Sequence, residues 1–217
     1  MTNDLYLYLL VDLIISFMAF LLVNRTYKIK GFKLFVFNFV SIILGVISTM
    51  MMSYIESGSF KGTSFYGAVF LLPVFTYFLS FIFNINSWKL FNLSSILVMI
   101  TSAILKVRCF VYGCCGGKKI PIETDYGFMD FPSQIVEMIF ALLIFILLLF
   151  LFFRNKDRKD LYPIMMIVYG VGRFILNSYR LVVPLFGFMS FGHIWSIISV
   201  IVGIIWLIIL HKKKINN

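Results

Sequence analysis

An arginine lies within an otherwise apolar stretch, in Tyr169-Gly-Val-Gly-Arg173-Phe-Ile-Leu-Asn177-Ser-Tyr-Arg180. A charge in the middle of a bilayer costs about 2.5–3.5 kcal/mol on the insertion scale, so Arg173 needs a partner, a cavity or a ligand. At about 3.6 residues per turn, the four numbered residues share one helix face, and the two glycines allow a helix or a ligand to approach closely. We expect this face to point into a helix bundle and to bind a ligand there.

A carboxylate that could serve this arginine follows a proline, in Phe131-Pro132-Ser133-Gln134-Ile135-Val136-Glu137. The proline can begin a helix, and Gln134 and Glu137 then lie on one face of it. We expect Glu137 to neutralise or orient Arg173 and not to act as a free general base, because a nearby arginine keeps a carboxylate ionised. The alternative to a functional site is a structural ion pair of Arg173 with Glu137 or Asp12.

The segment 106–132 is the one long loop that the sequence predicts, and it is rich in glycine and in charged residues. Its glycines let backbone N–H groups approach an anion, and its cations suit a phosphate. The cations at its start are Lys106, Arg108, Lys118 and Lys119.

The same loop contains all three cysteines of the chain, Cys109, Cys114 and Cys115. An outer-face location would permit a disulfide between Cys109 and one of the adjacent pair, whereas three thiols without a nearby histidine are a weak zinc motif. We expect a structural or packing role for the cysteines and no metal. Neither His193 nor His211 has an evident triad partner, so neither is assigned to catalysis.

The elements that must position these residues are membrane helices. The chain has 217 residues, of which 61% are hydrophobic and 13% charged, and a mean hydropathy of +1.00, which excludes a soluble fold. A bilayer is crossed by about 20 apolar residues, and such runs occur at 5–23, 34–52, 65–83, 90–107, 133–153, 161–180 and 193–210. We predict an all-α integral membrane protein, with residues 1–217 as a single polytopic membrane domain. The first span lacks a small-residue cleavage site and is expected to be retained.

Basic residues are distributed unevenly over the loops. When the loops alternate across the bilayer, most of the 19 Lys and Arg residues fall on one side, which the positive-inside rule makes cytoplasmic. They are Arg25, Lys28, Lys30, Lys33, Lys89, Arg154, Lys156, Arg158, Lys159, Lys212, Lys213 and Lys214. The N-terminus is then outside and the C-terminus cytoplasmic. Because topology explains most of the basic charge, we expect no nucleic-acid partner.

The remaining cations belong to the outer half or to its loops, where the positive-inside rule gives no reason for them. They are Lys61, Lys106, Arg108, Lys118, Lys119, Arg173 and Arg180. Phospholipid head groups are anionic and abundant at the outer leaflet. We therefore predict a phosphate-binding site there.

Four segments resemble, in order and spacing, those of the prolipoprotein diacylglyceryl transferases, which are seven-helix enzymes of the bacterial plasma membrane. The family's loop G-R-x-G-[N or C]-F-x-x-G-x-x-x-G is similar to residues 105–117, and its H-P-[S/T]-Q-x-x-E element to 131–137. Its Y-G-x-x-R-F-x-x-E-x-x-R element is similar to 169–180, and its S-x-G-Q-x-x-S element to 190–196. Four motifs in sequence are far more specific than any one of them.

The resemblance implies transfer of a diacylglyceryl group from phosphatidylglycerol to the lipobox cysteine of a prolipoprotein, in the bacterial plasma membrane and without a cofactor. The implied partners are phosphatidylglycerol, the prolipoprotein signal peptide and membrane lipids. Arg173, with Lys106 or Arg108, would hold the lipid phosphate. Tyr169 and Tyr66 would hydrogen-bond the head group or relay the proton of the thiol. The implied substrate-binding residues are Tyr66, Cys109, Gly113, Gly117, Gln134, Glu137, Asn177 and Arg180.

The chain departs from the family pattern at several matched positions. It has Lys106 for the loop arginine, Cys109 for the usual asparagine, Tyr66 for a histidine, Asn177 for a glutamate and His193 for a glutamine. A lysine keeps the charge of an arginine but not its bidentate geometry. Two alternatives stay open: a divergent paralogue that uses another acceptor, and a non-catalytic protein that binds or transports phospholipid.

Overall fold

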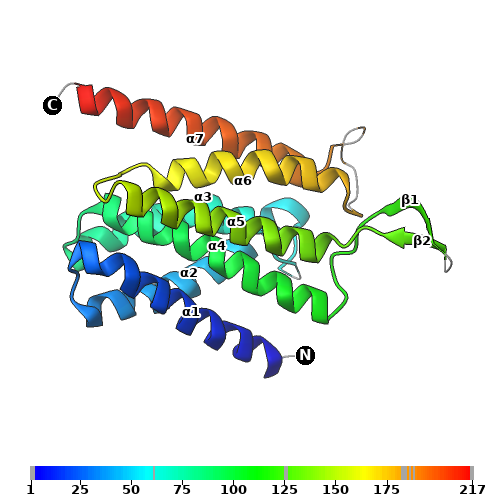
Figure 1. The fold of residues 1–217 in the computed structure, drawn as a ribbon, viewed down its shortest axis with the longest axis horizontal. Coiled ribbons are helices and arrows are strands. Elements are labelled where there is room, and N and C mark those ends of the chain that lie inside the picture. Colours follow the sequence, from blue (N-terminus) through cyan, green and yellow to red (C-terminus); the bar gives the residue numbers. More distant parts are fainter. Residues whose placement is uncertain are drawn as a thin grey trace.

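The structure is a computed structural model that describes residues 3–60, 62–124, 127–181, 185, 187 and 189–215. Figure 1 shows the helices and the small hairpin that these residues form. The elements are α1 (Asn3–Tyr27), α2 (Gly31–Ser57), α3 (Tyr66–Phe83), α4 (Ser87–Val111), β1 (Lys119–Thr124), β2 (Gly127–Asp130), α5 (Ser133–Arg154), α6 (Leu161–Ser178) and α7 (Phe191–Ile215).

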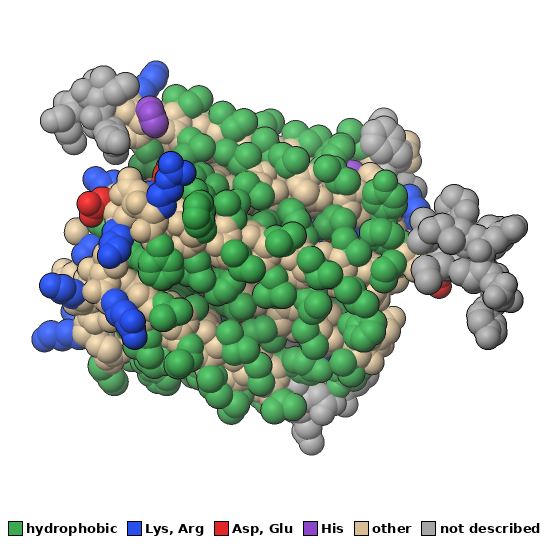
Figure 2. All heavy atoms as spheres, in the orientation of Figure 1, with side chains coloured by type: hydrophobic (Ala, Val, Ile, Leu, Met, Phe, Trp, Pro, Cys, Tyr) green, Lys and Arg blue, Asp and Glu red, His purple; other side chains and the backbone are tan. Residues whose placement is uncertain are grey.

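Within the described residues, seven helices are long and apolar enough to cross a membrane, which confirms the predicted fold class. Their outer surface is apolar: large hydrophobic side chains cover the face of the bundle that Figure 2 shows, and Ile82 on α3 is 72% exposed. In water such a surface would aggregate, whereas lipid tails solvate it. The positions of the spans therefore follow from hydropathy, and their order agrees with the prediction.

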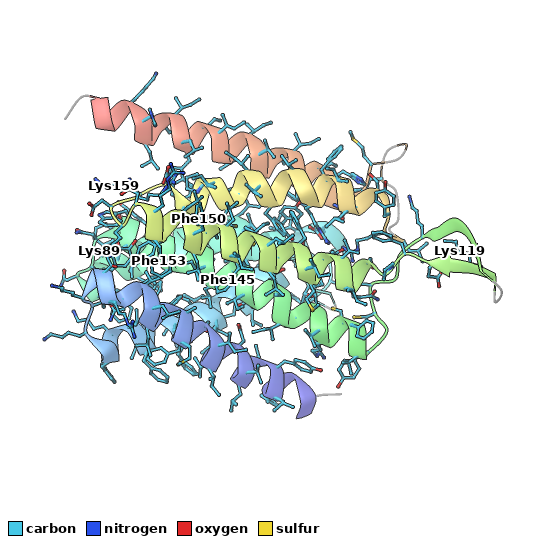
Figure 3. All side chains as sticks on the ribbon, in the orientation of Figure 1. Lys89, Lys119, Phe145, Phe150, Phe153 and Lys159 are labelled. Atoms are coloured by element: carbon cyan, nitrogen blue, oxygen red, sulfur yellow. The ribbon has the colours of Figure 1, made fainter. Side chains whose placement is uncertain are left out.

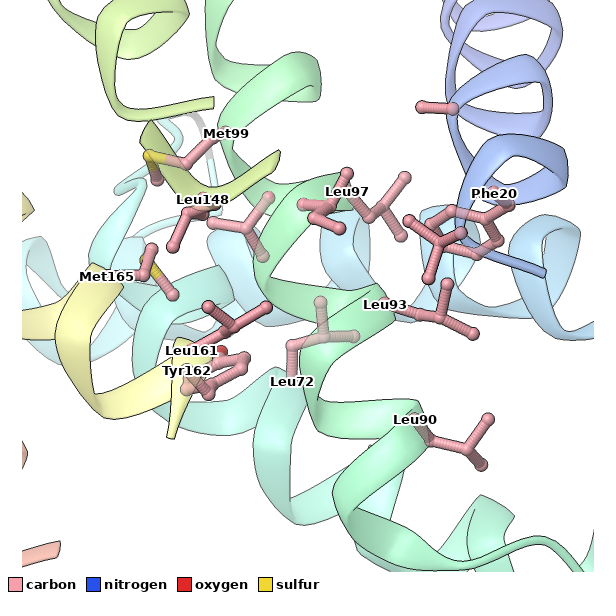
Figure 4. Packing of buried hydrophobic residues seen from close by; sticks show 14 of the residues in the cluster. Phe20, Leu72, Leu90, Leu93, Leu97, Met99, Leu148, Leu161, Tyr162 and Met165 are labelled. Atoms are coloured by element: carbon pink, nitrogen blue, oxygen red, sulfur yellow. The ribbon is translucent and has the colours of Figure 1, made fainter. Parts of the chain in front are cut away.

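Helix α4 occupies the interior of the bundle. In α4, 72% of the most apolar window is buried, compared with 22% in α7 at the edge. Several small polar residues lie on its buried faces and find partners there: Ser94 bonds to Thr76 of α3 at 2.8 Å, and Asn92 donates to the Tyr27 hydroxyl at 2.8 Å. Figure 4 shows the apolar packing around α4, with Leu93 and Leu97 among its labelled residues. Such hydrogen bonds hold neighbouring membrane helices together where lipid offers no hydrophobic driving force.

On the face that Figure 2 shows, Lys and Arg side chains gather mainly at one end of the bundle. Figure 3 places Lys89 and Lys159, two of the cations assigned to the cytoplasmic side, at one end, and Lys119 at the other. Between them lie apolar side chains of α5 such as Phe150. Successive loops thus lie at alternate ends of the bundle, as the predicted topology requires. The sidedness itself remains a prediction from the positive-inside rule.

The segment 106–132 differs from the expected loop. Helix α4 continues to Val111, so Lys106 and Cys109 lie in its last turns, and an antiparallel hairpin follows in which Lys119 pairs with Asp130 and Thr124 with Gly127. Hydropathy marks only the part of a helix inside the bilayer, while backbone hydrogen bonding continues beyond it. The hairpin projects from the end of the bundle opposite the C-terminus (Figure 1).

Close packing of α2 against α3 depends on Gly67. A Cβ atom at this position would lie 1.9 Å from the backbone oxygen of Ser48, far inside van der Waals contact. The Ser64 amide just before α3 also donates to the Thr49 carbonyl of α2 at 3.0 Å. The N-terminus of α3 is thus fixed against α2, and it is here that Tyr66 enters the bundle.

We predict that Gly67→Ala lowers the thermal unfolding midpoint of the protein in detergent micelles, whereas Gly45→Ala in α2 leaves it unchanged or slightly raises it. The first variant forces two backbones apart, and overpacking costs about 1–3 kcal/mol or more. The control is matched, because a Cβ at Gly45 meets no atom within 4 Å. Equal midpoints for the two variants would contradict the close approach of α2 and α3.

Candidate active site

One buried carboxylate binds three cations at the hairpin end of the bundle. Glu137 Oε2 lies 2.5 Å from Lys106 Nζ and 2.5 Å from Arg173 Nη1, and Glu137 Oε1 lies 3.3 Å from Arg180 Nε. The Glu137 side chain is only 5% exposed, and the three cationic side chains are 11–15% exposed. The predicted ion pair of Arg173 with Glu137 is therefore present. Asp12 instead accepts hydrogen bonds from Thr101.

The cluster joins three helices. Lys106 comes from the end of α4, Glu137 from the second turn of α5, Arg173 from α6, and Arg180 from two residues beyond the end of α6. Three positive charges meet one negative charge, so the cluster carries a net charge of +2. Excess charge in a dry site is costly unless a further anion neutralises it. The arrangement suits a bound phosphate.

The backbone of the glycine-rich segment holds Arg180 in place. Gly117 forms an antiparallel bridge with Arg180, and on either side the Lys118 amide donates to the Tyr179 carbonyl at 2.8 Å and the Leu181 amide to the Gly116 carbonyl at 3.2 Å. A Cβ at Gly117 would lie 2.1 Å from the backbone oxygen of Phe131. Only glycine allows this approach.

A cavity of about 300 Å³ lies next to the cluster, between α3, α6 and the start of α7. That volume fits the polar part of a small-molecule ligand. Two cations of the cluster, Arg173 and Arg180, line it. The other lining residues are Glu56, Thr63, Ser64, Phe65, Tyr66, Tyr169, Asn177, Ser190, Phe191 and Gly192.

Two tyrosines form one wall of this cavity. Their ring centroids are 5.8 Å apart, and Tyr66 and Tyr169 are 3% and 4% exposed. The Tyr66 hydroxyl is hydrogen-bonded to the Ser196 hydroxyl at 2.5 Å, and Ser196 itself donates to the Gly192 carbonyl at 2.6 Å. Because a serine has one proton to donate, Tyr66 is the donor to Ser196, and its lone pairs remain available to accept a hydrogen bond.

Asn177 is the most deeply buried polar group on the cavity wall, with 1% exposure. Its side-chain nitrogen has no hydrogen-bond partner among the described residues. A buried amide donor without a partner costs about 1–3 kcal/mol, so this nitrogen is positioned to donate to a ligand in the cavity.

Other residues that the sequence analysis named lie outside the cluster. The Arg108 guanidinium lies over the Tyr112 ring, 5.1 Å from its centroid, so Lys106 and not Arg108 reaches Glu137. Gln134 donates to the Cys114 carbonyl at 2.5 Å and so contacts the loop. Gly113 has a φ of 63° in the turn after α4, a conformation that glycine adopts without strain. Lys61 lies outside the described residues.

All three cysteines are free thiols. A hydrogen bond from Cys109 and the nearby charges of Lys106 and Arg180 lower the pKa of Cys115 to about 5, against the opposing effect of partial burial. Two cations of the cluster, Lys106 and Arg180, are therefore close enough to the loop between α4 and β1 to make its environment electropositive.

The buried hydrogen-bond partners of His193 and the cavity residue Glu56 escaped the sequence analysis. His193 is 1% exposed, and its Nδ1 accepts from the Ser190 amide at 3.2 Å, while its Nε2 lies 3.4 Å from Ser178 Oγ. Glu56 lines the cavity and accepts a hydrogen bond from Ser64 at 2.6 Å. Glu56 lies four residues beyond the predicted apolar run 34–52, in the last turn of α2, and an acid so close to a span is a signal that could have pointed to it.

Comparisons with known proteins point to one family. The family model described as prolipoprotein diacylglyceryl transferase matches residues 4–209. The phosphatidylglycerol–prolipoprotein diacylglyceryl transferase of Clostridium tetani (strain Massachusetts / E88) is 28% identical over 130 residues, which are 55% of this chain and 52% of that protein. The chain thus spans about half the length of the curated relative it matches.

We predict that Glu137→Gln destabilises the fold by about 3–5 kcal/mol, because it leaves three buried cations without their carboxylate. The measurement is thermal or denaturant unfolding of the purified protein in detergent micelles. Lys106→Gln is the matched control: it removes one cation but leaves Arg173 and Arg180 paired with Glu137, so its effect is expected to be clearly smaller. An equal loss for the two variants would show that the carboxylate does not hold the cluster together.

Proposed function

Because this chain belongs to the prolipoprotein diacylglyceryl transferase family, we propose that it transfers a diacylglyceryl group from phosphatidylglycerol to the cysteine thiol of a lipoprotein precursor. As a multi-pass membrane protein it would act in the bacterial plasma membrane, on a prolipoprotein signal peptide. The observation that carries the proposal is the buried cluster of three cations on Glu137, which adjoins a cavity of about 300 Å³ in an apolar bundle.

The cations would bind the phosphodiester of the lipid. Arg173 and Arg180 face the cavity, and a guanidinium can donate two parallel hydrogen bonds to one phosphate. Lys106, which is not among the described residues that line the cavity, would add positive charge through its ion pair with Glu137. The Asn177 amide, which lacks a protein partner among the described residues, would donate to a phosphate or head-group oxygen.

In the transfer, the thiolate sulfur of the acceptor attacks the carbon of the diacylglycerol unit that carries the phosphate. The new bond is S–C, the broken bond is C–O, and the electron pair leaves with the oxygen of glycerol phosphate. The leaving group gains one negative charge in this step. Fixed cations that are already in place stabilise that developing charge, which lowers the barrier.

The acceptor must lose its thiol proton, since the thiolate is the nucleophile. Tyr66 and Tyr169 lie on the cavity wall, and we assign to them hydrogen bonds to the head group or relay of this proton. Glu137 would orient the cations and would not act as the base, because both of its oxygens are bound to cations. Gly117 would position Arg180 through the backbone bridge.

We expect Arg173→Ala to reduce diacylglyceryl transfer by at least about 100-fold, since removal of one preorganised donor to a developing oxyanion commonly costs 10²–10³. The assay uses purified protein, labelled phosphatidylglycerol and a synthetic lipobox peptide. Arg173→Lys should retain part of the activity, because it keeps the charge without the bidentate geometry. Arg158→Ala, at the opposite end of the bundle, should behave like the wild type.

Full turnover by Arg173→Ala would overturn the assignment of the phosphate site. Mass spectrometry of co-purified lipid separates the other outcomes. Bound phosphatidylglycerol with no transfer to any thiol would favour a protein that binds lipid without catalysis. Transfer to a thiol other than the lipobox peptide would favour a paralogue, in line with Tyr66 at the position of the family's histidine.

A further inference from the structure

The three thiols of the chain converge at the end of α4. The sulfur atoms of Cys109, Cys114 and Cys115 all lie within 4.8 Å of one another, and none is oxidised to a disulfide. Cys109 and Cys115 are half-buried, while Cys114 is exposed. Residues separated by five positions would not meet on an ordinary extended loop. Here the turn after α4 brings them together.

The fold holds the three residues from both sides. The Cys114 amide donates to the Cys109 carbonyl at 3.0 Å, which closes the chain back onto the last turn of α4. From α5, Gln134 and Ser133 donate to the carbonyls of Cys114 and Cys115, each at 2.5 Å. The positions of the sulfur atoms are therefore set by two helices and not by the loop alone.

Three thiolates at this separation are a ligand set for a soft divalent metal. Tetrahedral zinc binds sulfur at about 2.3 Å, which places its ligand sulfurs about 3.8 Å apart. The observed upper limit of 4.8 Å needs only side-chain adjustment to close. Zinc with three thiolates carries a net charge of −1, and the cluster of Lys106, Arg173 and Arg180 on Glu137 offers the complementary positive charge.

We propose that Cys109, Cys114 and Cys115 bind a zinc ion, with the fourth coordination position open on the exposed side. From the sequence we expected no metal at these cysteines, and the proximity of all three sulfur atoms is what changes that interpretation. Three protein ligands with one exchangeable position are typical of reactive and not of purely structural zinc sites. The ion would also fix the loop whose carbonyls bind Ser133 and Gln134, one turn before Glu137.

The test is direct metal binding to the full-length protein, purified anaerobically in detergent with its thiols reduced and metal removed by a chelator. Zn²⁺ alone is titrated against a chromogenic chelator, and Co²⁺ is used as a spectroscopic probe. We expect one ion per chain, and for Co²⁺ the near-ultraviolet charge-transfer band of thiolate ligands with the visible bands of tetrahedral geometry. This readout does not depend on transferase activity or on any variant.

Variants then identify the ligands. Cys109→Ser and Cys115→Ser should each weaken zinc binding by at least about tenfold, and the charge-transfer band should fall. His211→Gln removes a possible ligand at the opposite end of the protein and should bind zinc like the wild type. Diacylglyceryl transfer by a zinc-free protein would not contradict the metal site, and absence of zinc would not contradict the transfer. This proposal and the proposed function can therefore fail separately.

Three results would overturn the zinc site: no stoichiometric ion in the wild type, a Co²⁺ spectrum without thiolate charge transfer, or unchanged affinity in a Cys109→Ser/Cys115→Ser double variant. In protein isolated without reductant, a count of one thiol under denaturing conditions would also do so, because two of the three cysteines would then form a disulfide in place of a metal site.

Discussion

The buried carboxylate of Glu137 organises the end of the bundle that holds the cavity. A carboxylate out of water needs cations close by, and three cations in one place need a carboxylate. Lys106, Arg173 and Arg180 therefore meet on it from two helices and the chain beyond α6. Because the charges do not cancel, the same group that stabilises the fold leaves positive charge for an anionic ligand. Stability and the proposed binding of substrate rest here on one interaction.

Other parts of the structure hold the side chains of this cluster and of the adjoining cavity in position. Helix α4 is buried along most of its length, so Lys106 projects from a fixed axis. The bridge between Gly117 and Arg180 ties the chain beyond α6 to the loop after α4. Gly67 lets α3 lie close to α2 and so carries Tyr66 to the cavity wall. Each contact is local, but all of them position residues around the Glu137 side chain or in the adjoining cavity.

Hydropathy is sufficient to predict the seven helices, because the bilayer imposes one requirement on every span. The free-energy cost of burying a charge likewise makes Arg173 and Glu137 recognisable in the sequence. Periodicity cannot decide between Lys106 and Arg108, since which of two nearby cations reaches a partner depends on the helix axis. Periodicity also places Arg180 on the helix, whereas α6 ends at Ser178. The backbone bridge with Gly117 instead holds Arg180 next to Glu137.

The contrast between α5 and α6 bears on how the chain enters the membrane during synthesis. Among the seven spans of the described residues, α6 has the lowest mean hydropathy, 1.2, and the preceding α5 has the highest, 3.1. A short turn joins them, and Arg173 of α6 is paired with Glu137 of α5. Partition of α6 into lipid is thus the least favourable among these seven spans, and pairing with α5 assists it, so we expect the two to enter the bilayer together as a helical hairpin. The charge of Arg173 would then enter the bilayer already paired with Glu137.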